Sequence, residues 1–147
     1  MAYLELILIV ITLLVGLSII WSTLKTGISP MMSSSQACQA MLASVESTSN
    51  RPIIDLGSGW GTLVVAVARQ YPNQKVIGYE LSCLPWLVSV IRKYCLRLDN
   101  LTLYRKDFRG AELGDASILF CYLFPAGMLA LHEKLVSERV GELMIVS

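Results

Sequence analysis

The stretch from Asp55 to Gly61, DLGSGWG, decides the fold of this chain. It closes an apolar run and carries a glycine at every second position: Gly57, Gly59 and Gly61. A second apolar run, at 76–79, ends in Glu80, 19 residues after the last of these glycines. Strand, glycine turn, helix, strand and acid, in this order, are typical of a nucleoside-binding βαβ unit. The glycines permit a close approach of a ligand to the main chain, and Glu80 can accept hydrogen bonds from two ribose hydroxyls.

The spacing of the glycines discriminates between ligands. The dinucleotide fingerprint G-x-G-x-x-G would need glycine at 62, where Thr62 stands. The observed acid-x-G-x-G-x-G form resembles motif I of the class I S-adenosylmethionine (SAM) methyltransferases. SAM has no pyrophosphate, and its carboxylate can face the free N–H groups at the start of the next helix. A dinucleotide site and a glycine turn in some other α/β protein are the alternatives.

Other stretches are similar to a narrower family, the small membrane-anchored protein-lysine methyltransferases of mitochondria and their bacterial relatives. These stretches are 78–81 (GYEL), 85–88 (PWLV), 104–108 (YRKDF) and 133–135 (EKL). The similarity runs from about residue 27 to the end of the chain. In one respect the chain departs from the mitochondrial members: its segment between Glu80 and Pro85 is longer, which could alter packing beside the ribose.

The resemblance assigns roles to the residues that follow the expected strands. The backbone of Gly57–Gly61 would cradle the methionine part of SAM, with Asp55 ordering that loop. Glu80 would hold the ribose hydroxyls, and Asp107 would accept from the adenine amino group with Phe108 close to the ring. The implied cofactor-binding residues are therefore Asp55, Gly57, Ser58, Gly59, Gly61, Glu80, Asp107 and Phe108. The alternative for Glu80 and Asp107 is an ordinary cap at the end of a strand.

The acceptor side of the site is expected at Tyr122 and Pro125. Methyl transfer to an amine needs alignment and desolvation more than acid–base groups. A lysine acceptor must lose its proton, from a free pKa of about 10.4. Tyr122 and the carbonyls around Phe124 and Pro125 lie where such an amine would arrive and could orient it; the alternative is a strand-end aromatic. His132, mid-helix, is interpreted as a surface residue rather than a base.

The N-terminal segment is apolar enough to enter a membrane. Hydrophobic residues make up 54% of the chain and charged residues 16%, against about 25% charged in a typical soluble domain. From Leu6 to Leu24 there is no charged residue, and Trp21 stands near the end of this run. A bilayer requires about 20 such residues, so we expect the chain to contact lipid through residues 4–24. The alternatives are a signal peptide, which lacks a basic start and a cleavage site here, and a buried core helix.

The orientation and the compartment follow from weaker signals. Lys25 follows the span and Glu5 precedes it, so the positive-inside rule predicts a single-pass membrane protein with its catalytic domain in the cytoplasm. Four cysteines without C-x-x-C spacing are interpreted as small buried side chains in a reducing compartment, not as metal ligands. A net charge of +1 gives no reason to expect nucleic acid as a partner.

The remaining pattern predicts a Rossmann-like, doubly wound parallel α/β sheet after one transmembrane helix. We divide the chain into an anchor (1–25), a linker with a first helix (26–50) and a SAM-binding methyltransferase domain (51–147). The expected strands are 53–56, 75–79, 101–104, 118–122 and 142–146, and the expected helices are 36–45, 62–70, one beginning near Pro85, and 128–136. A complete class I methyltransferase sheet has seven strands, so this domain is C-terminally short: either the fold is minimal or the chain is cut.

The helix near Pro85 carries an apolar set at helical spacing: Leu84, Leu87, Val88, Ile91, Cys95 and Leu98. Arg92, Lys93 and Arg97 take its other face, which we interpret as a solvated surface, with a basic stripe beside anionic lipid as the alternative.

These expectations combine into one function with two alternatives. The chain is expected to be a SAM-dependent methyltransferase that N-methylates lysine in a membrane or membrane-associated protein. The alternatives are a methyltransferase of a lipid or small lipophilic acceptor, and a SAM-binding protein without turnover.

Overall fold

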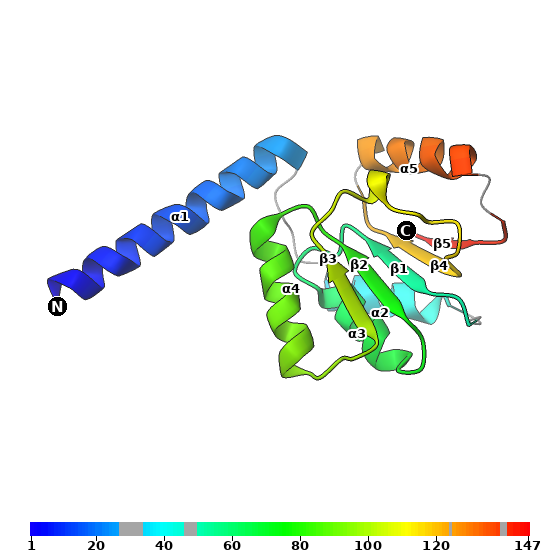
Figure 1. The fold of residues 1–147 in the computed structure, drawn as a ribbon, viewed down its shortest axis with the longest axis horizontal. Coiled ribbons are helices and arrows are strands. Elements are labelled where there is room, and N and C mark those ends of the chain that lie inside the picture. The colour runs from blue at the N-terminus through cyan, green and yellow to red at the C-terminus, as the bar shows by residue number, and fades with distance from the viewer. Residues whose placement is uncertain (27–33, 46–49, 124, 139–140) are drawn as a thin grey trace.

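The computed structural model describes residues 1–26, 34–45, 50–123, 125–138 and 141–147. Figure 1 shows a long N-terminal helix that projects from an α/β domain. Most of the linker expected after the span, residues 27–33, lies outside the described residues, as does Phe124. The helices are α1 (Ala2–Thr26), α2 (Ser35–Ala43), α3 (Thr62–Gln70), α4 (Cys83–Cys95), the 3₁₀ turn η1 (Phe108–Gly110) and α5 (Pro125–Glu138).

The domain is built on a parallel sheet in the order β3-β2-β1-β4-β5. The strands are β1 (Ile53–Leu56), β2 (Val76–Tyr79), β3 (Leu101–Tyr104), β4 (Ile118–Cys121) and β5 (Met144–Val146). From β1 the chain winds to β2 and β3 on one side, and then returns to β4 and β5 on the other. The direction of winding therefore reverses at β1, and ligands of such sheets bind at the carboxyl ends of the strands beside this point. The predicted Rossmann-like parallel fold is confirmed.

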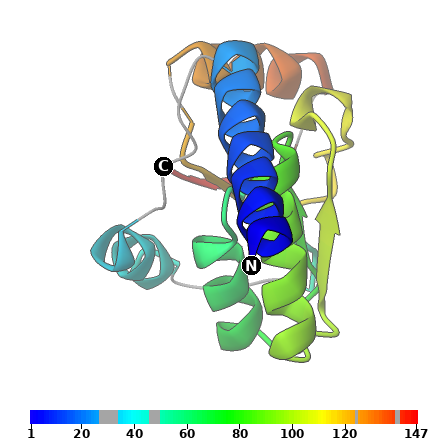
Figure 2. The same cartoon turned by 90° about the vertical axis from the view of Figure 1, so that its left-hand side faces the viewer.

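Both faces of the sheet are covered, which explains why its central strands are apolar at nearly every position, with Asp55 of β1 as the charged exception. All four residues of β1, β2 and β4 are buried. Alternate residues of these strands join two cores, one packed with α2 and α3 and the other with α5 and the segment around η1. Figures 1 and 2 show α5 on the opposite side of the sheet from α2 and α3.

Local sequence signals place most helix ends close to their expected positions. α3 has the predicted bounds, and α2 begins one residue early, where the Ser34 hydroxyl accepts a hydrogen bond from the N–H of Ala37 at 3.1 Å. α5 begins at Pro125, three residues before its predicted start at 128. Proline is favoured at the first position of a helix because it lacks only an N–H that would be unpaired there.

The N-terminal helix α1 is long and apolar enough to cross a membrane. Its candidate span, Tyr3–Trp21, has a mean hydropathy of 2.6, and none of it is buried in the protein, so it is not a core helix. The hydroxyls of Thr12 and Thr23 donate to the carbonyls of Leu8 and Ile19 within the helix, at 2.8 and 2.9 Å. These bonds satisfy polar groups that lipid could not. The helix α1 packs beside α4.

The interpretation of α4 is corrected by the structure in two respects. Arg92 is not part of a solvated surface: it is half-buried, and its Nη1 donates to the carbonyl of Trp60 at 3.0 Å. Conversely, Leu87 and Ile91 of the apolar set are 45% and 53% exposed. Two of the cysteines are also exposed rather than buried, Cys83 and Cys95 at the two ends of this helix.

The side-chain amide of Asn100 closes the end of α3, and we expect it to contribute measurably to stability. Its Nδ2 lies 2.9, 3.0 and 3.1 Å from the carbonyls of Ala68, Tyr71 and Gln74. Asn100→Ala removes the donor shared by these carbonyls and should lower the free energy of unfolding by about 1–3 kcal/mol. Urea denaturation in detergent, followed by far-UV circular dichroism, measures this difference.

The neighbouring exposed residue supplies a matched control. Asp99→Ala should change the free energy of unfolding by less than about 0.5 kcal/mol. Equal effects of the two variants would contradict this role of Asn100.

Candidate functional site

The glycine loop, residues 57–61, forms a tight turn at the carboxyl end of β1. Gly57 and Ser58 both donate their N–H groups to the carbonyl of Tyr79 at 2.9 Å, which ties the loop to the end of β2. All three glycines have positive φ, and at Gly61 (φ 80°) a Cβ would lie only 2.7 Å from the Ser89 hydroxyl of α4. The loop therefore needs glycine there both for its backbone conformation and for its contact with α4.

Glu80 holds the glycine loop and the entry to α4 together. One carboxylate oxygen accepts from the N–H of Gly59 at 2.8 Å, and the other accepts from the N–H of Ser82 at 2.7 Å. The residue is 9% exposed and follows directly after β2. Each carboxylate oxygen can accept more than one hydrogen bond, so these contacts are compatible with the ribose role predicted for Glu80.

Asp55 lies beneath the glycine loop in the middle of the sheet. It is 3% exposed, and its Oδ2 has no hydrogen-bond partner among the described residues. Burial, together with the negative charge of Glu80, raises the pKa of Asp55 from 3.8 to about 7. A buried carboxyl group with an unpaired oxygen is rare in folded proteins, and perturbed groups of this kind are concentrated at functional sites.

The inner face of α4 supports the loop through two polar side chains that the sequence analysis did not select. The Ser89 hydroxyl lies 2.9 Å from the carbonyl of Gly59 and 3.0 Å from that of Pro85. One turn later, Arg92 donates to the carbonyl of Trp60. Ser89 and Arg92 share one helix face with Pro85. The sequence did not reveal this inward face, because a polar helix face is normally interpreted as the solvent side.

Unpaired polar atoms near the loop indicate that a polar ligand belongs there. The hydroxyls of Ser58 and Thr62 are buried and have no hydrogen-bond partner in the described part of the chain. Thr62 opens α3, where free N–H groups and the helix dipole favour an anion such as the SAM carboxylate. The carboxylate at the end of β2 suits a ribose, and the unpaired hydroxyls with the glycine backbone suit the amino-acid part of a nucleoside linked to an amino acid.

Asp107 and Phe108 lie beyond the end of β3, the strand next to β2. Asp107 caps η1 by accepting from the N–H of Arg109 at 2.9 Å, and it is half-buried. Phe108 is half-buried and packs against the core below α5. Asp107 thus caps η1, and its contact with adenine stays a prediction.

The loop after β4 lies against the glycine loop. A Cβ at Gly57 would lie 3.1 Å from the Leu123 side chain, so the two loops are in close contact. Tyr122 precedes this leucine and is 65% exposed, and Pro125 is also exposed. The structure therefore places the predicted acceptor residues beside the predicted cofactor loop, across the point where the sheet reverses.

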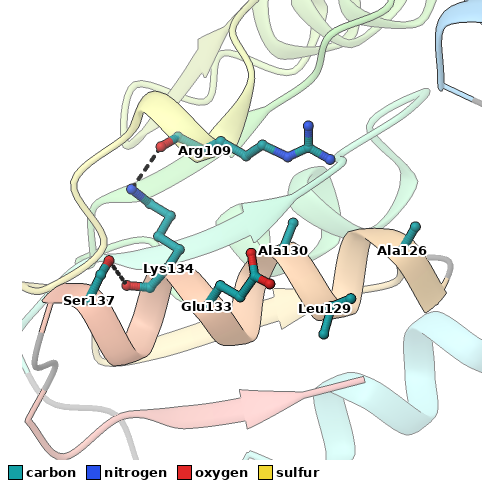
Figure 3. A pocket seen from close by; sticks show the side chains of 7 residues that line it. All are labelled: Arg109, Ala126, Leu129, Ala130, Glu133, Lys134 and Ser137. Carbon is teal, nitrogen blue, oxygen red and sulfur yellow. Dashed lines mark hydrogen bonds between the residues drawn. The ribbon is translucent and has the colours of Figure 1, made fainter.

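A separate shallow hollow lies between η1 and α5 (Figure 3). It is lined by Arg109 and by six residues of α5 between Ala126 and Ser137. Lys134 crosses it to donate to the carbonyl of Arg109 at 2.9 Å and also pairs with Glu138 at 2.6 Å. None of the residues predicted to bind the cofactor lines this hollow.

Comparison with known sequences decides the family. Residues 55–147 match the family described as the ANTKMT methyltransferase domain. This range holds the end of β1, the glycine loop and the four strands β2 to β5. The chain belongs to this family. The resemblance to protein-lysine methyltransferases is thereby confirmed, and S-adenosylmethionine is the cofactor. No curated protein sequence matches the chain.

Solved methyltransferases share the fold. An RNA methyltransferase from Salinibacter ruber, in complex with S-adenosyl-L-homocysteine, has a TM-score of 0.65 at 21% identity, over 74% of this chain and 71% of its own. A dimethyladenosine transferase from Plasmodium falciparum has a TM-score of 0.64 at 18% identity, over 78% of this chain and 42% of its own. Coclaurine N-methyltransferase, bound to N-methylheliamine and S-adenosyl-L-homocysteine, has a TM-score of 0.58 at 18% identity, over 75% and 33%. This chain thus spans less than half the length of the last two proteins. Because the three proteins have different acceptors, the shared fold does not determine the acceptor.

Replacing Glu80 should weaken SAM binding. Glu80→Gln keeps the shape but turns one oxygen into a donor, which cannot accept from a ribose hydroxyl or a backbone N–H. The loss of one or two hydrogen bonds to a charged group should raise the Kd for SAM by about 10- to 100-fold. Calorimetric titration with SAM measures this change, and Glu112→Gln, at an exposed carboxylate, is the matched control. An unchanged Kd in the Glu80 variant would refute its role.

Asp55 should make the stability of the protein depend on pH. A carboxyl group with a pKa of about 7 in the folded chain and 3.8 in the unfolded chain binds its proton more tightly when folded. The free energy of unfolding should therefore fall as the pH rises between these two values. In Asp55→Asn this contribution is absent, so the urea midpoint should fall less steeply from pH 4 to pH 7. Parallel pH profiles for the two proteins would contradict the raised pKa.

Proposed function

We propose that this protein is a membrane-anchored methyltransferase that transfers the methyl group of SAM to the side-chain amine of lysine in a membrane or membrane-associated protein. The observation that carries the proposal is the position of the Leu123 side chain, which lies so close over Gly57 that it would crowd a Cβ there and so brings the exposed loop after β4 to the cofactor loop. An acceptor at this loop would therefore lie beside the methyl donor.

The chain has a group suited to each part of SAM. The glycine backbone and the start of α3 would hold the methionine part, Glu80 the ribose and Asp107 the adenine. When bound, SAM supplies an activated methyl group on a positively charged sulfur, which a neutral amine can attack. The protein then needs only to align the amine and to exclude water.

The loop after β4 would prepare the amine. A protonated lysine cannot attack, and transfer from water into a partly closed site lowers its pKa from about 10.4. The Tyr122 hydroxyl offers an acceptor that would orient the arriving ammonium group until its proton leaves to water. His132, on the exposed side of α5, is not needed for this step.

The helix α1 would hold this site at a membrane. The span Tyr3–Trp21 has the length and apolarity that a bilayer requires, and Trp21, 72% exposed, would lie at its interface. Lys25 follows the span, so the positive-inside rule favours a domain on the cytoplasmic side. Lysines in loops at that surface would be accessible, and lysines in freely soluble proteins would be disfavoured.

Tyr122→Phe should slow methyl transfer more than it weakens SAM binding. The hydroxyl would contact only the acceptor, so the Kd for SAM should stay the same. The single-turnover rate of methyl transfer to acceptors in membranes should fall by roughly tenfold, the effect of one lost hydrogen bond. Radiolabelled SAM, with protein and lipid fractions separated afterwards, measures transfer. Tyr71→Phe, distant from the loop after β4, is the matched control.

The same experiment distinguishes the proposed acceptor from the alternatives. Label in the protein fraction, recovered as methyl-lysine, supports the proposal. Label in the lipid fraction alone would contradict the lysine acceptor, and SAM binding without label in either fraction would contradict the enzyme.

A further inference from the structure

The helix α4 shows an unusual distribution of side chains. Its outer surface carries what we call the α4 stripe: Cys83, Leu87, Ile91, Tyr94 and Cys95, all of them exposed. No charged residue belongs to this stripe, and Tyr94 is 71% exposed. A surface helix of a soluble domain normally has the opposite arrangement, with a polar outer face. In α4 the polar groups Ser89 and Arg92 instead point inward to the glycine loop.

The α4 stripe lies on the side of the domain where α1 leaves it. The helix α1 packs beside α4, and Figure 1 shows α1 extending away from the sheet beyond α4 while α4 runs across its direction. In Figure 2, where this side faces the viewer, α1 lies in front of α4. If α1 passes through a bilayer, α4 therefore lies along the surface of that bilayer.

The charges around the α4 stripe match a lipid surface. Between Leu81 and Lys106 the chain has five basic residues and one acidic residue, although its overall net charge is only +1. Lys93 lies over the ring of Tyr94, with its Nζ 5.6 Å from the ring centre, and Arg105 donates to the sulfur of Cys83 at 3.3 Å. Basic groups thus border the apolar stripe at both ends, as in helices that bind anionic membranes.

We infer that α4 is an interfacial helix, whose stripe enters the surface of the anionic bilayer that α1 spans. This inference rests on the proposed membrane anchor. The inner face of α4 holds the carbonyls of Gly59 and Trp60, and the helix begins three residues after Glu80. The bilayer would then fix the orientation of the whole site, and acceptors would be limited to groups close to the lipid headgroups.

Spin labels on the full-length chain test this inference. Cys83→Ser leaves Cys95 as the exposed thiol among the cysteines, because Cys38 and Cys121 are buried. A nitroxide at Cys95 is examined in vesicles of phosphatidylcholine and phosphatidylglycerol, with oxygen as the lipid-soluble and a nickel chelate as the water-soluble relaxing agent. The matched control is a label at Val136→Cys in a chain whose two exposed cysteines are replaced by serine. Val136 lies on α5 and its side chain is 66% exposed.

The inference predicts that oxygen relaxes the Cys95 label more than the nickel chelate does, and that the order is reversed at position 136. A label at Leu14→Cys reports on the anchor separately. If oxygen dominates at 14 but the chelate dominates at 95, the anchor stands and the inference about α4 is wrong. If the chelate dominates at 14 as well, the proposed anchor itself fails. Spin–spin coupling between two Cys95 labels would instead show a second copy on the stripe and overturn the inference.

A charge placed in the stripe provides a causal test. Ile91→Glu should increase the relaxation of the Cys95 label by the nickel chelate relative to oxygen, while the chain remains in the vesicles through α1. Val136→Glu should leave both relaxation rates of the Cys95 label unchanged. Equal responses to the two variants would contradict lipid contact at α4.

Discussion

The carboxylate of Glu80 connects the two segments on which the site depends. By accepting from the N–H groups of Gly59 and Ser82, it fixes the glycine loop after β1 to the entry of α4 after β2. Ser89 and Arg92 complete this connection from the other side, because they bind carbonyls of the same loop. Glu80 thus directs the N–H of Gly59, while the N–H groups of Gly57 and Ser58 donate to the carbonyl of Tyr79. Donors on α4 hold the carbonyls of Gly59 and Trp60, and the result is a rigid backbone surface for the cofactor.

Two acidic side chains, Asp55 and Glu80, lie close together around the glycine loop. Asp55 lies buried below the loop with an unpaired oxygen and a raised pKa, close enough to Glu80 for the two negative charges to oppose each other. A bound cofactor with a positive sulfur and hydroxyl donors would relieve this unfavourable arrangement. On its outer side α4 is apolar, so one helix could transmit contact with the bilayer to the loop.

The sequence predicted those parts of the protein that depend on local signals. The strand before Asp55, the glycine turn and the helix at Thr62 were placed correctly because apolar runs, glycines and helix formers specify them within a few residues. The inward face of α4 could not be predicted, since the partners of Ser89 and Arg92 are loop carbonyls about 30 residues earlier. Of the predicted apolar set, Leu87, Ile91 and Cys95 instead lie on the surface. The roles of the other predicted site residues depend on a ligand, and they remain predictions.

Hydrogen–deuterium exchange of the full-length protein, with and without S-adenosylhomocysteine, tests the account most directly. The described site predicts that the ligand slows exchange at the amides of 57–62, at 80–82, at 107–108 and at the loop after β4, while α1 and α5 are unaffected. Protection centred on α5, or no protection at the glycine loop of a protein that binds the ligand, would contradict it.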